Sequence, residues 1–249
     1  MLFRLSETHG IFPLSAGVGH NKVIIQGVNF PELVQTVLIY ALPVLFAITL
    51  HEAAHGYAAR HFGDNTAWMM GRVTLNPVPH IDWVGTLVMP LVLYFATSGG
   101  MLFGYAKPVP VRFDRLNNPK RDMIWVALAG PAINLVQALL WGALLYLLVG
   151  AGLHERFFLE MCRAGMLVNV VMFAFNLFPL PPLHGGRVLV GLLPWRQALM
   201  FSRIEPYGFF IVMALVLMGI VSEWWMRPLM DLSFDFLKLA LSPLDFLVK

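Results

Sequence analysis

The chain has 249 residues, of which 58% are hydrophobic and only 12% carry a charge. A soluble domain is about a quarter charged, so this composition and a mean hydropathy of +0.71 exclude an ordinary soluble protein. The net charge of +3 comes from 17 Lys and Arg against 14 Asp and Glu, and no basic stretch interleaved with aromatic residues indicates nucleic-acid binding.

Glycines and prolines interrupt the first 30 residues, so we expect no signal peptide there and assign insertion to the first apolar segment. Five stretches without Asp, Glu, Lys or Arg then follow, and each approaches the roughly 20 residues that a helix needs to cross a bilayer. They cover residues 33–50, 83–106, 123–153, 164–186 and 206–222. The sequence therefore predicts an all-α polytopic membrane protein with about five apolar segments.

The second of these segments differs from the others, because four glycines and a proline interrupt residues 83–106. Non-helical backbone at membrane depth is tolerated only where protein buries it or where it lines a cavity. We therefore expect a re-entrant piece with short β-strands between Gly71 and Val111. Residues 105–111 could form an edge strand that pairs with an unwound substrate, or a plain loop.

The C-terminal tail, from Trp224 onward, alternates apolar pairs with charged residues, which is typical of an amphipathic, interfacial helix. We divide the chain into an N-terminal segment (1–32), a membrane-embedded domain (33–222) and this tail (223–249). If all five segments cross, the two sides carry ten and seven Lys and Arg, and the positive-inside rule favours the first side as cytoplasmic.

The end of the first segment carries His51, Glu52 and His55 in a His-Glu-x-x-His pattern. Residues four apart share one face of a helix, so both imidazoles can bind one metal ion. Glu52 lies about 100° around the helix, where it can take a proton from a zinc-bound water whose pKa falls to about 7. Such a pattern also occurs by chance, but ionisable residues beside an uncharged membrane segment are functional by default.

A tetrahedral zinc ion needs a third protein ligand besides two histidines and a water molecule. The strongest candidate is His184, which stands where three prolines and two glycines interrupt a later apolar segment. The alternative is a loop histidine at the membrane interface. The single cysteine, Cys162, can form neither a cysteine cluster nor an internal disulfide.

These motifs resemble the site-2 protease family of intramembrane zinc metalloproteases. The resemblance rests on the order and spacing of residues 51–56, 104–110, 129–134 and 176–187. It implies a zinc metalloendopeptidase with one Zn²⁺ per chain that cleaves transmembrane segments of membrane-protein substrates near the cytoplasmic face. The family has an Asp where this chain has His184. We expect zinc binding with altered geometry, since three histidines also support hydroxide formation on zinc.

Two asparagines are further candidates for the site. Asn134 follows Gly130 and Pro131 in the longest apolar segment, where it either packs helices or supports the metal ligands or the substrate. By the resemblance, Asn176 could hydrogen-bond the substrate backbone or a developing oxyanion, or it could be structural. The remaining histidines are expected to be solvated: His9, His20, His61, His80 and His154.

Topology places a condition on this metal site. If every segment crossed the bilayer once, His184 would lie on the opposite side from His51 and could not share its metal. We therefore expect residues 83–106 to dip into the membrane and return, so that His51, His55 and His184 converge. The expected localisation is a multi-pass protein of the bacterial cell (inner) membrane, with the active site toward the cytoplasm.

The leading interpretation is an intramembrane zinc endopeptidase whose partners are transmembrane protein substrates and the lipid bilayer. The alternative is a non-enzymatic pseudoprotease or membrane scaffold that binds transmembrane helices, which His184 favours and the intact Glu52 opposes. A metal transporter is a third interpretation. It would need further ionisable residues along a path, and the apolar segments offer almost none.

Overall fold

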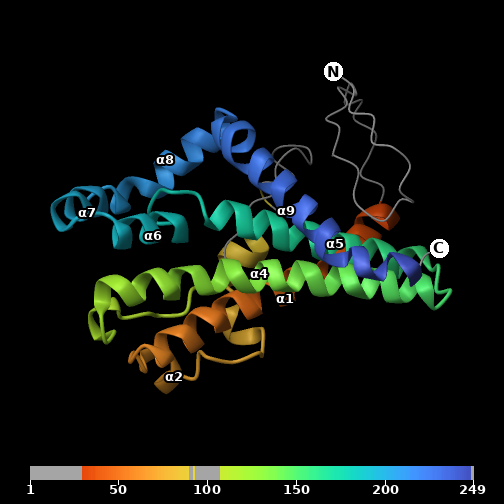
Figure 1. Cartoon of the computed structure of the whole chain (residues 1–249), viewed down its shortest axis with the longest axis horizontal. Coiled ribbons are helices and arrows are strands. Elements are labelled where there is room, and N and C mark those ends of the chain that lie inside the picture. Colours follow the sequence, from red (N-terminus) through yellow and green to blue (C-terminus); the bar gives the residue numbers. More distant parts are fainter. Residues whose placement is uncertain (1–29, 90–91, 93–106, 248–249) are drawn as a thin grey trace.

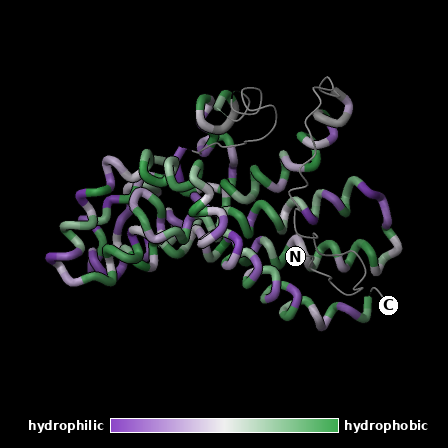
Figure 2. The backbone as a smooth tube through the Cα atoms, turned by 90° about the horizontal axis from the view of Figure 1, so that it is seen from above, coloured by the Kyte–Doolittle hydropathy of each residue, from purple (hydrophilic) through white to green (hydrophobic). Residues whose placement is uncertain are grey.

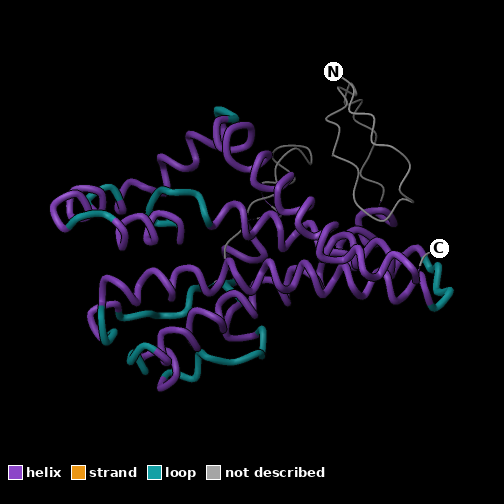
Figure 3. The backbone as a smooth tube through the Cα atoms, viewed as in Figure 1, coloured by secondary structure: helices purple, strands orange, loops and turns teal. Residues whose placement is uncertain are grey.

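The computed structural model describes residues 30–89, 92 and 107–247. These residues form helices joined by turns, and none of them lies in a β-strand (Figure 3). Three long helices make the frame of the molecule: α1 (Phe30–His61), α4 (Pro119–Gly150) and α5 (Arg156–Asn176). By length and composition, each of the three can cross a membrane.

The number of spanning helices differs from the prediction of five. The last predicted segment forms α8 (Glu205–Leu217), which reaches the length of a span only together with α7 (Trp195–Ser202). A bend of 68° separates these two helices. The described residues therefore contain three spanning candidates, or four if the bent pair is one span, and the count of five is not confirmed.

The stretch from Gly71 to Val111 contains no strand in its described part. It holds a 3₁₀ turn (Val78–His80) and a π-helix (Trp83–Val88), and Asp82 caps the latter by accepting the Gly85 N–H at 2.7 Å. Prolines near both ends of this stretch, at positions 77, 79, 108 and 110, remove backbone donors that a strand ladder would need. Residues 90–91 and 93–106, with most of the predicted re-entrant piece, lie outside the described residues.

The three long helices alternate in direction. Nδ1 of His55 in α1 donates to the carbonyl of Val126 in α4, whereas Nδ2 of Asn134, further along α4, donates to the carbonyl of Ala47. Residues earlier in α1 therefore contact residues later in α4, so the two helices are antiparallel. The short turn at residues 151–155 then reverses the chain into α5 (Figure 1). As a result, the end of α1, the beginning of α4 and the end of α5 meet at one end of the bundle.

The two ends of the predicted re-entrant stretch lie together. The backbone N–H of Lys107 donates to the carbonyl oxygen of His80 at 3.0 Å. The chain therefore leaves from and comes back to the same end of the bundle between residues 80 and 107. The alternating directions of α1, α4 and α5 then bring His184 to the end of the bundle at which His51 and His55 stand.

The remaining helices attach to this frame. The α6 helix (His184–Leu192) lies against α4, where Gly191 leaves room for Ile124. The α9 helix (Arg227–Leu241) runs back along α4 and α5, with Leu237 packed on Ala138 and Val170 (Figure 1). Shorter pieces complete the described chain: α2 (Thr66–Met69), Phe113–Arg115, Ser222–Met226 and Ser242–Leu247.

The tail helix α9 has two kinds of surface. Ser233, Leu237 and Leu241 are buried against α4 and α5, while Asp231 and Asp235 are exposed. This spacing of three to four residues is that of an amphipathic helix whose buried face packs on the frame.

Apolar side chains also cover much of the outer surface. Leu140 of α4 and Phe210 of α8 are exposed by 63% and 71%. Figure 2 shows hydrophobic stretches along the helices, interspersed with hydrophilic ones. Exposed apolar belts of this kind fit a lipid environment. One histidine departs from its prediction, because His80 is buried and bonds to the Thr74 carbonyl rather than being solvated.

Candidate metal centre

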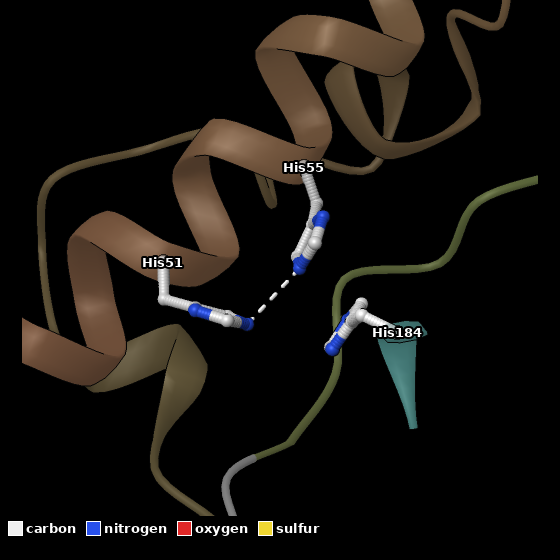
Figure 4. Close-up of side chains that lie close together, drawn as sticks. All are labelled: His51, His55 and His184. Atoms are coloured by element: carbon white, nitrogen blue, oxygen red, sulfur yellow. Dashed lines mark hydrogen bonds between the residues drawn. The ribbon is translucent and has the colours of Figure 1, made fainter. Parts of the chain in front are cut away.

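The His-Glu-x-x-His pattern lies in the last third of α1 and is helical throughout, as predicted. His51 and His55 are one turn apart and both are buried, at 2% and 5% exposure. Their rings turn toward α4, and their two Nε2 atoms lie 3.0 Å apart (Figure 4). The helical period therefore produces the paired nitrogens that the sequence predicts.

His184 joins this pair from a distant part of the chain. It is the first residue of α6, and its ring centroid lies 4.2 Å from that of His55 and 5.1 Å from that of His51 (Figure 4). One ligand atom from each histidine lies within 4.8 Å of the other two. Among the described residues, these three histidines are the cluster of potential ligand side chains that could hold a metal ion.

Close packing fixes the backbone at His184. A Cβ atom at Gly185 would lie 2.0 Å from the carbonyl oxygen of Leu177, and one at Gly186 would lie 2.1 Å from the backbone nitrogen of Pro181. Only glycine permits this approach, so the beginning of α6 rests directly on the loop that precedes it. The two glycines after His184 thus determine how far its ring stands from α1.

The tautomers of His51 and His55 follow from their Nδ1 atoms. Nδ1 of His55 lies 2.7 Å from the carbonyl oxygen of Val126, which can only accept, so this nitrogen carries a proton. Nδ1 of His51 lies 2.5 Å from Oδ1 of Asn134 and is protonated for the same reason. Both Nε2 atoms therefore carry lone pairs that face each other. Lone pairs at 3.0 Å repel, and a cation bound by both nitrogens removes that repulsion.

The tautomer of His184 is also fixed by an acceptor oxygen at its Nδ1. Its Nδ1 lies 2.9 Å from Oδ1 of Asn176, whose Nδ2 donates to the carbonyl of Met172. Desolvation by the surrounding protein lowers the pKa of His184 well below its usual range, so the ring is neutral. Its Nε2 is left as the ligand atom. In each of the three histidines, a carbonyl-type oxygen holds Nδ1 and leaves Nε2 free for a metal, the arrangement typical of zinc-binding imidazoles.

The spacing of the donors fits a zinc ion. Two nitrogens bound tetrahedrally at about 2.0 Å from zinc lie about 3.3 Å apart. The 3.0 Å between the Nε2 atoms of His51 and His55 is close to that value. Three neutral imidazoles are also a donor set that zinc accepts in catalytic sites, with a position left for water or substrate.

Gly130 of α4 forms the wall behind these nitrogens. A Cβ atom there would lie 2.3 Å from Nε2 of His55 and 2.6 Å from Nε2 of His51. The absence of a side chain at Gly130 is therefore what leaves space for the two imidazoles. This role of Gly130 was not predicted from the sequence.

Replacement of this glycine is expected to damage the centre selectively. Gly130→Ala should weaken zinc binding by at least about 10-fold, because the new methyl group displaces both ligand rings. The measurement is zinc affinity of the purified protein, by competition with a chromophoric chelator. Gly142→Ala is the matched control on the same helix, since its Cβ would meet only side-chain atoms of Leu241 and Met166, which are flexible and lie away from the metal centre. Equal zinc affinity of Gly130→Ala and wild type would contradict this packing argument.

Glu52 lies on the neighbouring face of α1. Its Oε2 accepts the backbone N–H of Val109 at 2.7 Å. Nη2 of Arg72 donates to the carbonyls of Lys107 and Pro108, at 2.9 and 3.3 Å, and so holds this segment in place. The carboxylate of Glu52 is thereby oriented through one oxygen, and Oε1 has no such partner among the described residues.

The two predicted asparagines both contact metal-site histidines. Asn134 bonds to His51, and Asn176 bonds to His184. Both atoms of the Asn176 amide are engaged, which favours support of His184 over direct contact with a substrate. Asn169 of α5 was not predicted. It is fully buried, accepts from Asn134 of α4 and donates to the carbonyl of Gly165 one turn earlier in α5. An amide in an apolar segment was the signal that could have identified it.

The fold and the site define a helical membrane protein whose three histidines could hold one metal ion beside a carboxylate. The chain is 35% identical to "Putative zinc metalloprotease YwhC" of Bacillus subtilis (strain 168), over 75% of this chain and 82% of that protein. It is 30% identical to "Putative zinc metalloprotease Rip2" of Mycolicibacterium smegmatis, over 77% of this chain and 71% of that protein. No family model and no solved structure matches. The chain belongs to the site-2 protease family of zinc metalloproteases.

Proposed function

We propose that this protein is an intramembrane zinc endopeptidase that cleaves transmembrane segments of membrane-protein substrates. One observation carries the proposal: three imidazoles each bring a ligand nitrogen within 4.8 Å of the other two, and Glu52, next to His51 in the sequence, has its carboxylate held by a backbone N–H. Zinc bound by His51, His55 and His184 would supply Lewis-acid activation of a scissile carbonyl and of a water molecule.

Glu52 is the general base in this proposal. Its free Oε1 takes a proton from the attacking water while the water oxygen bonds to the scissile carbon. The same carboxylate then delivers the proton to the amide nitrogen as the carbon–nitrogen bond breaks. The Val109 N–H keeps Oε2 in place throughout, so the carboxylate needs no reorientation between the two proton transfers.

The segment that holds Glu52 is also suited to contact a substrate backbone. Arg72 fixes Lys107 and Pro108, and the backbone N–H of Arg112 bonds to Asp64 at 2.6 Å, so both ends of residues 107–112 are anchored. A peptide bond within a helix is inaccessible until the helix unwinds. An anchored segment beside the base would receive the unwound part of a substrate.

The distribution of basic residues supports a cytoplasmic orientation of the metal end. Seven Lys and Arg lie between residues 60 and 121 and three between residues 187 and 203, out of 17 in the chain. Both stretches adjoin the end of the bundle that holds the histidines. By the positive-inside rule this end faces the cytoplasm, in a bacterial inner membrane.

The test is cleavage of single-span reporter proteins by the purified protein, with and without its metal. We expect cleavage within the membrane span, mapped by product mass, that is lost on removal of zinc by a chelator and restored by adding Zn²⁺. Cleavage that survives complete zinc removal would exclude the proposed chemistry. No cleavage of any reporter by the zinc-loaded protein would favour the scaffold that binds transmembrane helices.

A further inference from the structure

Two buried amides connect the metal centre to a helix that provides no ligand. Asn134 of α4 and Asn169 of α5 are both 0% exposed, in a bundle built mostly of apolar side chains. Burying an amide costs free energy unless its hydrogen bonds are made, and both side chains make them. Nδ2 of Asn134 donates to Oδ1 of Asn169 at 2.8 Å, and Nδ2 of Asn169 donates to the carbonyl of Gly165 at 2.9 Å.

The direction of these hydrogen bonds is fixed at both ends. The carbonyl oxygen of Gly165 can only accept, so the Nδ2 side of Asn169 must face it and its Oδ1 must face Asn134. Asn134 then has to present Nδ2 to Asn169, and the nearby carbonyl of Ala47, at 3.2 Å, requires the same orientation. Oδ1 of Asn134 is thereby directed at Nδ1 of His51, 2.5 Å away.

We propose that Asn169 is a positioning residue for the metal centre, because it holds the amide of Asn134 in the orientation that presents the Nε2 lone pair of His51 to the metal. The inference rests on the proposed zinc site. The bonds run from Gly165 through Asn169 and Asn134 to His51, so that α5 controls a ligand on α1 without touching the metal. Without Asn169, Asn134 keeps its bond to His51 and the longer bond from Nδ2 to Ala47, so the Nδ2 side of the amide loses its shorter partner.

A purely structural role for Asn169 makes a different prediction. Buried asparagines also join helices in membrane bundles by hydrogen bonding, and an apolar residue of similar size can replace them. In that case Asn169→Leu would be tolerated better than Asn169→Asp, which brings an ionisable group into an apolar bundle. The positioning role predicts the opposite order, because Asp keeps an oxygen that accepts from Asn134 and Leu does not.

The experiment compares zinc affinity among variants of the full chain in detergent, by competition with a chromophoric chelator. We expect Asn169→Leu to bind zinc about 10-fold more weakly, at the lower end of the range for partners of metal ligands because Asn169 acts through Asn134. Asn169→Asp should remain close to wild type, because a protonated carboxyl group at this position can accept from Asn134 and donate to the carbonyl of Gly165. Asn169→Ala also removes the amide and gives a second measurement if the leucine variant does not fold.

Gln137 provides a matched control on α4. It is one turn from Asn134, is 3% exposed, and its amide atoms have no hydrogen-bond partner among the described residues. Gln137→Leu is the same exchange of a buried amide for an apolar side chain, and we expect it to leave zinc affinity unchanged. Thermal unfolding of each zinc-free variant separates a loss of fold from a loss of metal affinity.

The results distinguish this inference from the proposed function. Equal zinc affinity of wild type and Asn169→Leu, or weaker binding by Asn169→Asp than by Asn169→Leu, overturns the positioning role while the peptidase proposal stands. A wild-type protein that binds no zinc overturns both. Weakened binding in Asn169→Leu, with Asn169→Asp and Gln137→Leu unaffected, is the pattern that the hydrogen-bond chain requires.

Discussion

Glu52→Gln is expected to lower kcat for reporter cleavage by about 10²- to 10⁴-fold while zinc affinity stays at the wild-type value. Glutamine has the size of glutamate, and its side-chain oxygen can still accept the Val109 N–H. Its amide cannot take a proton from water at neutral pH, so the general base is lost and the metal ligands are not. The measurements are initial cleavage rates at saturating substrate and zinc affinity on the same preparation.

The control for this substitution is Glu155→Gln. Glu155 is exposed in the turn between α4 and α5, at the opposite end of the bundle from the histidines, so its replacement should change neither quantity. Cleavage by Glu52→Gln at the wild-type rate would remove the proposed mechanism. Loss of zinc together with activity would instead assign Glu52 to the metal ligands.

The paired histidines on α1 could be predicted because they depend on local geometry alone. A spacing of four residues places His51 and His55 on one helix face whatever surrounds the helix. The approach of His184 required one further step, the argument that an even number of crossings must lie between the end of α1 and His184. The hydrogen bond from Lys107 to His80 supplies the physical basis for that step, since it joins the two ends of the intervening stretch.

The partners of the histidines could be predicted only in part, because they are tertiary contacts. Asn134 and Asn176 stand out in the sequence as amides near helix breaks, but nothing local shows which histidine each one bonds. The carbonyl of Val126 and the N–H of Val109 have no side-chain signal at all, because any residue carries them. The role of Gly130 was not predicted either, because its neighbours in space are ligand nitrogens from a distant part of the chain.

The expectation of strands between Gly71 and Val111 was wrong for the described residues, and the reason is local. Valine and tyrosine favour strands only where a neighbouring strand is available. Here the Asp82 side chain caps a helical turn, and Pro108 and Pro110 have no N–H to donate. His80 was misjudged for a related reason, because the same folded segment encloses it.

A histidine at position 184 differs from an aspartate in the charge it brings to the metal and in the reach of its donor atom. His184 contributes no ligand charge, whereas the aspartate that the family has at this position would. An imidazole also extends its donor atom further from the backbone than a carboxylate does. Gly185 and Gly186 fix the backbone of α6 against the preceding loop, so the helix cannot move inward to compensate for a shorter ligand.

His184→Ala is therefore expected to weaken zinc binding by more than about 100-fold, since loss of a mere outer partner of a ligand already costs 10- to 100-fold. His184→Asp should fall between alanine and wild type, because its carboxylate adds charge but stops short of the site that His184 reaches. Both values come from chelator competition, and cleavage should decrease in the same order. His154→Ala, which removes an exposed histidine from the turn at the far end of the bundle, should change neither. If His184→Ala binds zinc as tightly as wild type, His51 and His55 hold the metal without help from α6, and the three-histidine centre is wrong.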